Sequence, residues 1–276
     1  MAVEISKVWD RTTGFASGAL GAIMPIALVL LFVPISIQLA ITPLLVKQAV
    51  ATRVIVLFVF WAIELLGTLS LIALVLGGGI RAGEAMRAAL ARLGPAIAIF
   101  ILIGIVVAIV ASPIGIVLAH AGVDMAQLQA GDRAGIGALT AGSAWFMLLY
   151  GLVLVVVGVW VTAWLLVIEP VIVAERRRIG AIAHAFRLTR GLALKIVGVL
   201  ILYWIVATVA VWAAKAVFGS IFSLIAPNDG DIGLAVVLTS IVVAAVGAAF
   251  KTVAAIFVAR LYQAIGEVRE GTLDLA

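Results

Sequence analysis

Six long apolar stretches dominate this chain and leave few folds open to it. Each is long enough to cross the hydrocarbon core of a bilayer, which is about 30 Å thick and takes roughly 20 helical residues. With 66% hydrophobic and 11% charged residues, the chain of 276 residues has too few polar side chains to cover these stretches in water. The stretches run over residues 20–46, 54–76, 96–118, 145–168, 196–218 and 234–259.

The apolar stretches predict α-helices rather than the strands of a barrel. They are continuous, whereas a transmembrane strand alternates apolar and polar residues over about 10 positions. A helix also satisfies its own backbone hydrogen bonds inside lipid. We therefore expect an all-α membrane protein with six transmembrane helices, in which residues 1–276 form a single integral membrane domain.

The basic residues predict the orientation of the chain. With six spans, both termini lie on one side of the membrane, and that side receives 13 of the 18 Lys and Arg residues. Cytoplasmic loops carry an excess of Lys and Arg, so we expect both termini to be cytoplasmic. The N-terminal segment lacks the pattern of a secretory signal, and we expect it to be retained.

The cytoplasmic segments carry amphipathic patterns typical of helices that lie flat in the headgroup layer. Three such helices are expected, at about residues 3–17, 81–93 and 176–190. Each precedes a pair of spans, which indicates three repeats of an amphipathic helix plus a helical hairpin. Both a true duplication and a merely shared architecture fit this pattern. Gly94 and Gly191 are expected to let the chain turn sharply into the next span.

Three prolines, Pro25, Pro34 and Pro43, fall within the first apolar stretch. Each removes a backbone donor and clashes with the preceding turn, so we expect this helix to be kinked or broken. Proline is common in membrane helices, and one interpretation is purely structural. The other interpretation is a hinge, or an unwound segment that lines a cavity.

Ionisable side chains within the spans are the main candidates for a functional site, because a charge is costly inside a bilayer. Glu64 lies near the middle of the second span, and Lys251 in the sixth span is its most plausible partner, although the sequence leaves open whether the two pair. The pair fits either a structural role or a substrate or proton path. Glu169, at the end of the fourth span, is expected to pair with one of the arginines that follow it.

The segment between the fourth and fifth spans is rich in arginine. The chain has a net charge of +5, and its basic residues lie beside the predicted spans. This position favours binding of anionic lipid headgroups over binding of nucleic acid. Membrane lipids are therefore the expected partners, and the sequence leaves open whether the chain forms a homo-oligomer or binds a separate protein. The headgroup-binding residues are expected to be Arg176, Arg177, Arg178, Arg187 and Arg190.

The chain lacks the signatures of familiar catalytic sites. It has no cysteine, and therefore no disulfide and no thiolate nucleophile. His120 and His184 fall on opposite sides of the predicted topology, and no His, Asp or Glu group has the spacing of a metal site. A phosphate-binding loop and a nucleophile elbow are also absent from the sequence. We expect no enzymatic activity, no cofactor and no metal.

One part of the chain resembles a known family. The segment Glu169–Glu175, followed by Ala181–Gly191, resembles the membrane domain of bacterial glycerophosphoryl diester phosphodiesterases and of related six-span inner-membrane proteins. The shared pattern is a span that ends in proline, an acidic residue, and a helix that ends in Leu-Thr-x-Gly. The resemblance implies a multi-pass protein of the bacterial inner membrane. It implies no phosphodiesterase activity, because in the fused members that chemistry belongs to a separate soluble domain, which we expect to be absent here.

Two functions from different classes follow from these observations. The first is a non-catalytic accessory or scaffold protein that associates with lipid through the arginine-rich segment. The alternative is a small-molecule or lipid transporter with a central site near Glu64 and Lys251. An intramembrane enzyme is the weakest hypothesis, because no nucleophile–base pair is visible in the sequence.

Overall fold

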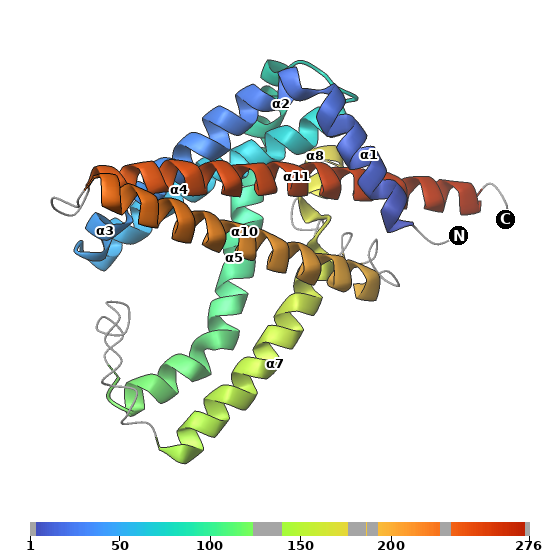
Figure 1. Cartoon of the computed structure of the whole chain (residues 1–276). Helices are drawn as coiled ribbons and strands as arrows, with labels where there is room; N and C mark the ends of the chain where they lie inside the picture. The colour runs from blue at the N-terminus through green and yellow to red at the C-terminus, as the bar shows by residue number, and fades with distance from the viewer. Residues whose placement is uncertain (1–3, 124–139, 176–185, 187–192, 227–232, 274–276) are drawn as a thin grey trace. The chain divides into compact units, whose positions relative to one another are not determined.

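The computed structural model describes residues 4–123, 140–175, 186, 193–226 and 233–273, and nearly all of these are helical (Figure 1). Six helical runs are long and apolar enough to span a membrane, which confirms the predicted all-α membrane fold. The runs are Leu20–Val46, Val50–Leu76, Ala82–His120, Ala141–Ala174, Ile196–Ile225 and Leu234–Val268.

The chain divides into two compact units. The larger unit contains Met1–Ile97 and Trp164–Ala276, and the smaller unit contains Ala98–Ala163. One element, η1, is a π-helical segment within the first span. In chain order the elements are α1 (Ile5–Gly18), α2 (Leu20–Ala27), η1 (Leu28–Phe32), α3 (Val33–Val46), α4 (Val50–Leu76), α5 (Ala82–His120), α7 (Ala141–Leu165), α8 (Ile168–Glu175), α10 (Ala193–Ile225) and α11 (Leu234–Leu273).

The core of the larger unit lies where α4, α11 and the first span pack together. α11 presents small residues to this core, among them Ala248, Ala255 and Ala259, which are almost completely buried. Small residues let helix backbones approach closely, and van der Waals packing of this kind holds membrane helices together. The fully buried side chains of Leu31 and Ile72 fill the space between the helices.

The first span is disturbed near its prolines, but it is not unwound. The helix widens into a π-helical turn at Leu28–Phe32, between Pro25 and Pro34. Pro34 has no N–H to donate to the carbonyl of Leu30 one turn earlier, and a widened turn accommodates this missing bond. Pro43 lies inside α3 without ending it. The prolines therefore produce a local change of helix type rather than a break.

Gly67 on α4 marks the place where the π-helical turn touches its neighbour. A Cβ atom added at Gly67 would lie 2.8 Å from Cδ2 of Leu31 and 3.1 Å from the carbonyl oxygen of Leu30. A side chain does not fit at these distances, so glycine is what allows the two helices to approach here. The contact fixes the first span against the stretch of α4 that also carries Glu64, one turn earlier.

The predicted interfacial helix at residues 81–93 is not separate from the span that follows it. α5 runs without interruption through the Gly94-Pro95 step, so the predicted sharp turn at Gly94 is wrong. Fully buried alanines form a continuous stripe on one face of α5 across this step, and they are Ala85, Ala89 and Ala96. Packing of this stripe outweighs the low helix propensity of Gly and Pro.

α1 is a separate helix, in agreement with the interfacial helix predicted at residues 3–17. It packs along α11, and its residues Val8 and Thr12 are buried. Arg11 donates two hydrogen bonds to the carboxylate of Glu267, at 2.8 and 3.0 Å. The first and last helices are therefore joined near the two ends of the chain, as expected for an even number of spans (Figure 1).

The structure allows only the first two of the three predicted repeats to be compared. α1 is separated from its span at Ala19, whereas the corresponding segment of the second repeat is continuous with its span in α5. The third amphipathic helix was predicted at residues 176–190, and it lies outside the described residues except for Phe186. The first two predicted repeats thus differ in architecture.

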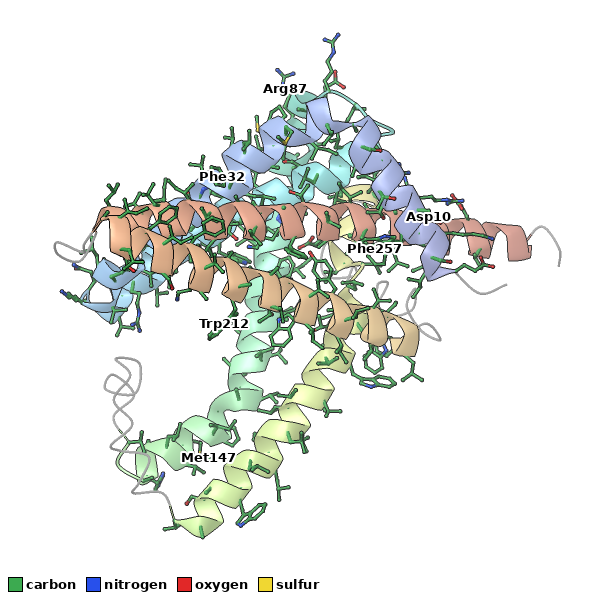
Figure 2. All side chains as sticks on the ribbon, in the orientation of Figure 1. Asp10, Phe32, Arg87, Met147, Trp212 and Phe257 are labelled. Atoms are coloured by element: carbon green, nitrogen blue, oxygen red, sulfur yellow. The ribbon has the colours of Figure 1, made fainter. Side chains whose placement is uncertain are left out.

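The smaller unit is a helix pair formed by the later part of α5 and most of α7. Tyr150 donates a hydrogen bond to the carbonyl of Val110 across the pair, at 2.7 Å, and its ring stacks on Phe146. Figure 2 shows the side chains of this pair, with Met147 labelled. Most of its apolar side chains are exposed, as expected for helices surrounded by lipid.

Candidate functional site: an intramembrane charge cluster

Glu64 is a buried carboxylate in the middle of a membrane span. It lies near the centre of α4, and only 8% of its surface is exposed. A carboxylate at this depth is costly unless it is paired, hydrogen-bonded or protonated. Nζ of Lys251 on α11 donates a hydrogen bond to Oε2 of Glu64. The structure therefore pairs Glu64 with the partner that the sequence favoured, and this ion pair joins two helices that are far apart in the sequence.

The two members of this ion pair differ in exposure. The side chain of Glu64 is 10% exposed, whereas that of Lys251 is 48% exposed. Thr252, the next residue on α11, is buried and donates a hydrogen bond to the carbonyl of Ala248. The helix face beside Lys251 is thus fixed by packing, while the Lys251 side chain, which is about half exposed, reaches a largely enclosed carboxylate.

Glu169 is a second carboxylate close to Lys251. It is half-buried near the start of α8, and the ammonium group of Lys251 is near enough to act on it electrostatically. Glu169 makes no hydrogen bond or ion pair with any described residue. The sequence pointed instead to a neighbouring arginine as the partner. The arginines in question, Arg176, Arg177 and Arg178, lie outside the described residues.

The fourth span is interrupted just before Glu169. α7 and α8 are separated by a turn at residues 166–167. Pro170 explains this interruption, because it has no N–H to donate to the carbonyl of Leu166. The span then continues to Ala174, further than the sequence predicted. Discontinuous helices of this kind line substrate and ion sites in many transporters.

The cluster has an unequal number of positive and negative groups. Glu64 comes from α4, Glu169 from α8 and Lys251 from α11, and these helices pack on one another. Lys251 is paired with Glu64 and also acts electrostatically on Glu169, so among these three described residues one negative charge is uncompensated when all are ionised. A proton or one monovalent cation would balance that charge. In the part of the chain that the structure describes, no three His, Cys, Asp or Glu side chains are grouped as metal ligands.

Tyr203 on α10 contacts α11 next to the cluster. Its hydroxyl donates a hydrogen bond to the carbonyl of Phe250, the residue before Lys251. The two rings also meet edge to face, with centroids 5.8 Å apart. This contact fixes the backbone next to Lys251. The sequence analysis did not single out Tyr203, although a phenol within a span requires a hydrogen-bond partner and was a usable signal.

An apolar groove lies between α1, α10 and α11. It has a volume of about 620 Å³, and the aromatic residues Trp9, Tyr203, Phe250 and Phe257 contribute to its walls. Phe257 is labelled in Figure 2, and its ring lies 6.2 Å from that of Trp9. Such a groove is chemically matched to an acyl chain of the surrounding lipid.

The remaining predicted site residues are placed as follows. Arg187 and Arg190, like the three arginines before them, lie outside the described residues. Among the three prolines, Pro43 lines a cavity that also contains Lys215. The structure thus brings Glu64, Glu169 and Lys251 together and leaves the arginine-rich segment undescribed.

These features define the class of the protein. It is a multi-pass α-helical membrane protein with an ionisable cluster among its spans. No protein-family model, no curated protein and no solved structure matches the chain. The similarity to phosphodiesterase membrane domains therefore stays a resemblance, and the function has to be inferred from the geometry of the site.

Proposed function

We propose that this protein is a small transporter of the bacterial inner membrane, with both termini in the cytoplasm. In this proposal the cluster of Glu64, Glu169 and Lys251 takes up and releases a proton or a monovalent cation as a small molecule is moved. The observation that carries the proposal is that Lys251 is hydrogen-bonded to the buried Glu64 within the membrane-spanning region and lies near enough to Glu169 to act on it electrostatically. Ionisable groups inside spans commonly mark ion pathways and proton relays.

A purely structural ion pair explains the cluster less well. Such a pair needs one carboxylate and one ammonium group, and Glu64 with Lys251 already supplies both. Glu169 then adds a second charge close to the pair, which raises the electrostatic cost without a partner of its own among the described residues. The presence of Glu169 is better explained if a proton or a monovalent cation binds to the cluster and is released from it.

The geometry supports a simple exchange mechanism. With Glu64 ionised, Lys251 is held on α4 by their hydrogen bond. A proton that arrives at Glu64 neutralises this carboxylate and releases the ammonium group, which then pairs with Glu169 on α8. Loss of the proton reverses the exchange. Protonation of Glu64 would thereby switch the partner of Lys251, and so connect α11 to α8 instead of to α4. Transport requires a two-state element of this kind.

Two irregular helices next to the cluster favour motion of this kind. α8 is joined to α7 by the turn at residues 166–167, and the first span contains the π-helical turn at Leu28–Phe32. Each of these two turns interrupts the regular pattern of helical hydrogen bonds. Each also lacks one such bond, because a proline has no N–H to donate. A helix can pivot at such a position without breaking further backbone bonds.

Proton movement in proteoliposomes tests the proposal. The purified chain is reconstituted with a pH-sensitive dye inside the vesicles, and a membrane potential is imposed with potassium and valinomycin. We expect proton entry above that of protein-free vesicles, and entry at the protein-free rate for Glu64→Gln and for Glu169→Gln. Glu84→Gln is the matched control, because Glu84 is exposed on α5 and lies outside the cluster.

Infrared difference spectroscopy covers the case in which proton entry requires an unidentified substrate. A pH step applied to the reconstituted protein should produce the stretching band of a protonated carboxyl group, and Glu64→Gln or Glu169→Gln should remove it. If Glu64→Gln and Glu169→Gln both keep the wild-type proton entry and the wild-type infrared response, the transport proposal is wrong.

A lipid-associated accessory role is the second candidate, and one observation favours it. The apolar groove between α1, α10 and α11 is lined by side chains suited to an acyl chain, and α1 is an amphipathic helix at its edge. This role predicts that phospholipid remains bound after purification and that neither proton entry nor the infrared response depends on Glu64. The same reconstitution therefore separates the two candidates.

A further inference from the structure

A second, separate cavity lies at the end of the larger unit where α3 leads into α4 and α10 approaches α11. It has a volume of about 380 Å³ and is formed by α3, α10 and the first turns of α11. This volume is within the range of small-ligand sites. Its walls differ from those of the apolar groove, because they include one ammonium group and several hydroxyl groups. The polar lining residues are Thr42, Lys215, Ser223, Thr239 and Ser240.

Among the described residues that line this cavity, Lys215 is the only charged one. It lies inside the fifth span, about 15 Å before the end of α10 at the helical rise. It makes no hydrogen bond or ion pair with any described residue. A lysine inside a span is costly, and it normally faces a polar cavity and an opposite charge. The cavity is present here, and its charge partner is missing from the described part of the chain.

The hydroxyl groups complement this ammonium group. Thr239 and Ser240 on α11 donate to the carbonyls of Ala235 and Val236, each at 2.7 Å. Thr42 on α3 makes the same kind of bond to its own helix, so none of these hydroxyls needs another protein group. Each hydroxyl can turn its single hydrogen from the carbonyl of its own helix towards a ligand, and so act as a donor in the cavity. The wall therefore offers several hydrogen-bonding groups around a single positive charge.

A ligand for this cavity must be negatively charged and rich in hydrogen-bond acceptors. A phosphate group meets both requirements, because its oxygens accept from an ammonium group and from hydroxyls together. The cavity also includes Ala235 and Val236 in the first turn of α11, the end of a helix that favours negative charge. The sign of the charge and the arrangement of donors thus point to the same ligand chemistry.

We propose that the cavity around Lys215 binds a phosphate-type oxyanion, supplied either by a phospholipid headgroup or as free phosphate. This site is independent of the proposed transport cluster. Ser240 and Lys251 are about three turns apart on α11, or roughly 16 Å along its axis, and the cavity contains none of the three cluster residues. Binding at Lys215 therefore stands or falls separately from the transport proposal.

Direct binding measurements test this site with two named probes. The first is phosphatidylglycerol, compared with diacylglycerol, which lacks the phosphate, by native mass spectrometry of the purified full chain. The second is inorganic phosphate, compared with chloride, by calorimetric titration in phosphate-free detergent. We expect Lys215→Ala to weaken binding of the responding probe roughly tenfold to a hundredfold, the range for loss of a charge-assisted hydrogen bond.

Two further variants test separately the positive charge of residue 215 and the free volume of the cavity. Lys215→Arg keeps the positive charge and should retain binding. Gly219→Leu keeps Lys215 and should block binding, because Gly219 lines the cavity and its added Cβ would meet Thr239 at an ordinary contact distance of 3.6 Å. Lys47→Ala is the matched control: it removes a lysine that follows α3, and Lys47 is not part of the cavity wall.

The outcomes are distinct. Binding of phosphatidylglycerol that depends on Lys215 identifies a lipid headgroup site, and binding of inorganic phosphate alone identifies a site for a soluble oxyanion. Either result supports the proposal. Equal binding by the wild-type chain and Lys215→Ala, or no binding of either probe by the wild-type chain, overturns it. Gel filtration and circular dichroism of each variant establish that the loss is not due to unfolding.

Discussion

The larger and the smaller units are both built from apolar helices, but they handle charge differently. In the described part of Ala98–Ala163 there is no Asp, Glu, Lys or Arg, and the helix pair is joined by the bond from Tyr150 to Val110. The larger unit buries Glu64 and places Glu169 and Lys251 around it. Two of its helices are also more enclosed: 39% of the apolar window of α4 and of α11 is buried, against 6% for α5, whereas α10 of the larger unit is as exposed as α5.

This difference shows what packing contributes to a membrane protein. An apolar helix pair in lipid needs few specific contacts, because lipid and apolar side chains are equivalent surroundings for it. A charge inside a span requires partners in defined positions, and defined positions require closely packed helices. The small residues of α11, together with Gly67 on α4, provide that packing in the unit that carries the charges.

Loss of the shared ammonium group should have the largest effect. Lys251→Met leaves the buried carboxylate of Glu64 without its ammonium partner, and we expect it to destabilise the larger unit by about 3 kcal/mol. The measurement is unfolding in mixed micelles at increasing SDS, followed by tryptophan fluorescence. Lys215→Met, which removes a lysine that has no partner among the described residues, should change the stability by less than about 0.5 kcal/mol. Equal losses of stability in Lys251→Met and Lys215→Met would contradict the pairing of Lys251 with Glu64.

A pair of glycine substitutions, one in each unit, should change the free energy of unfolding in opposite directions. Gly67→Ala forces a Cβ against Leu30 and Leu31, and we expect a loss of about 1–3 kcal/mol from overpacking. Gly151→Ala, on α7, meets no atom within 4 Å, so its higher helix propensity should leave stability unchanged or raise it by up to about 1 kcal/mol. The same unfolding assay measures both. A neutral Gly67→Ala variant would mean that the helices are not in close contact at this position.

A pair of tyrosine substitutions should give a smaller effect that differs in kind. Tyr203→Phe and Tyr150→Phe each remove one hydroxyl-to-carbonyl hydrogen bond, and each should cost about 1 kcal/mol. Only Tyr203 fixes the backbone beside Lys251, so only Tyr203→Phe should also slow proton entry into proteoliposomes. Equal proton entry in the two variants would show that Tyr203 has no positioning role.

The spans could be predicted from the sequence because length and hydropathy are local properties. Each run of about 20 apolar residues identifies a helix without knowledge of its neighbours. Lys251 could also be identified as a candidate partner for Glu64, because both lie within spans where an unpaired charge is costly. Depth along a helix can be counted from the sequence, but whether the two side chains meet depends on how α4 and α11 pack.

The position of Glu169 was not accessible in the same way. The sequence favours its arginine-rich neighbours, whereas proximity to Lys251 depends on which helices touch, and the order of apolar runs does not give that information. The continuity of α5 through Gly94 was missed for a similar reason. Its buried face consists of alanines, which carry no hydrophobic pattern strong enough to stand out in a chain with 66% hydrophobic residues.

A double-mutant cycle on Glu64 and Lys251 tests the central claim most directly. Glu64→Gln, Lys251→Met and the combined variant are compared with the wild-type chain by SDS unfolding in mixed micelles. If the two side chains form an ion pair among the spans, the combined variant should be more stable than the sum of the single losses predicts, by at least about 1 kcal/mol. Losses that add to within about 0.5 kcal/mol would show that the two residues do not interact, and the charge cluster would have to be abandoned.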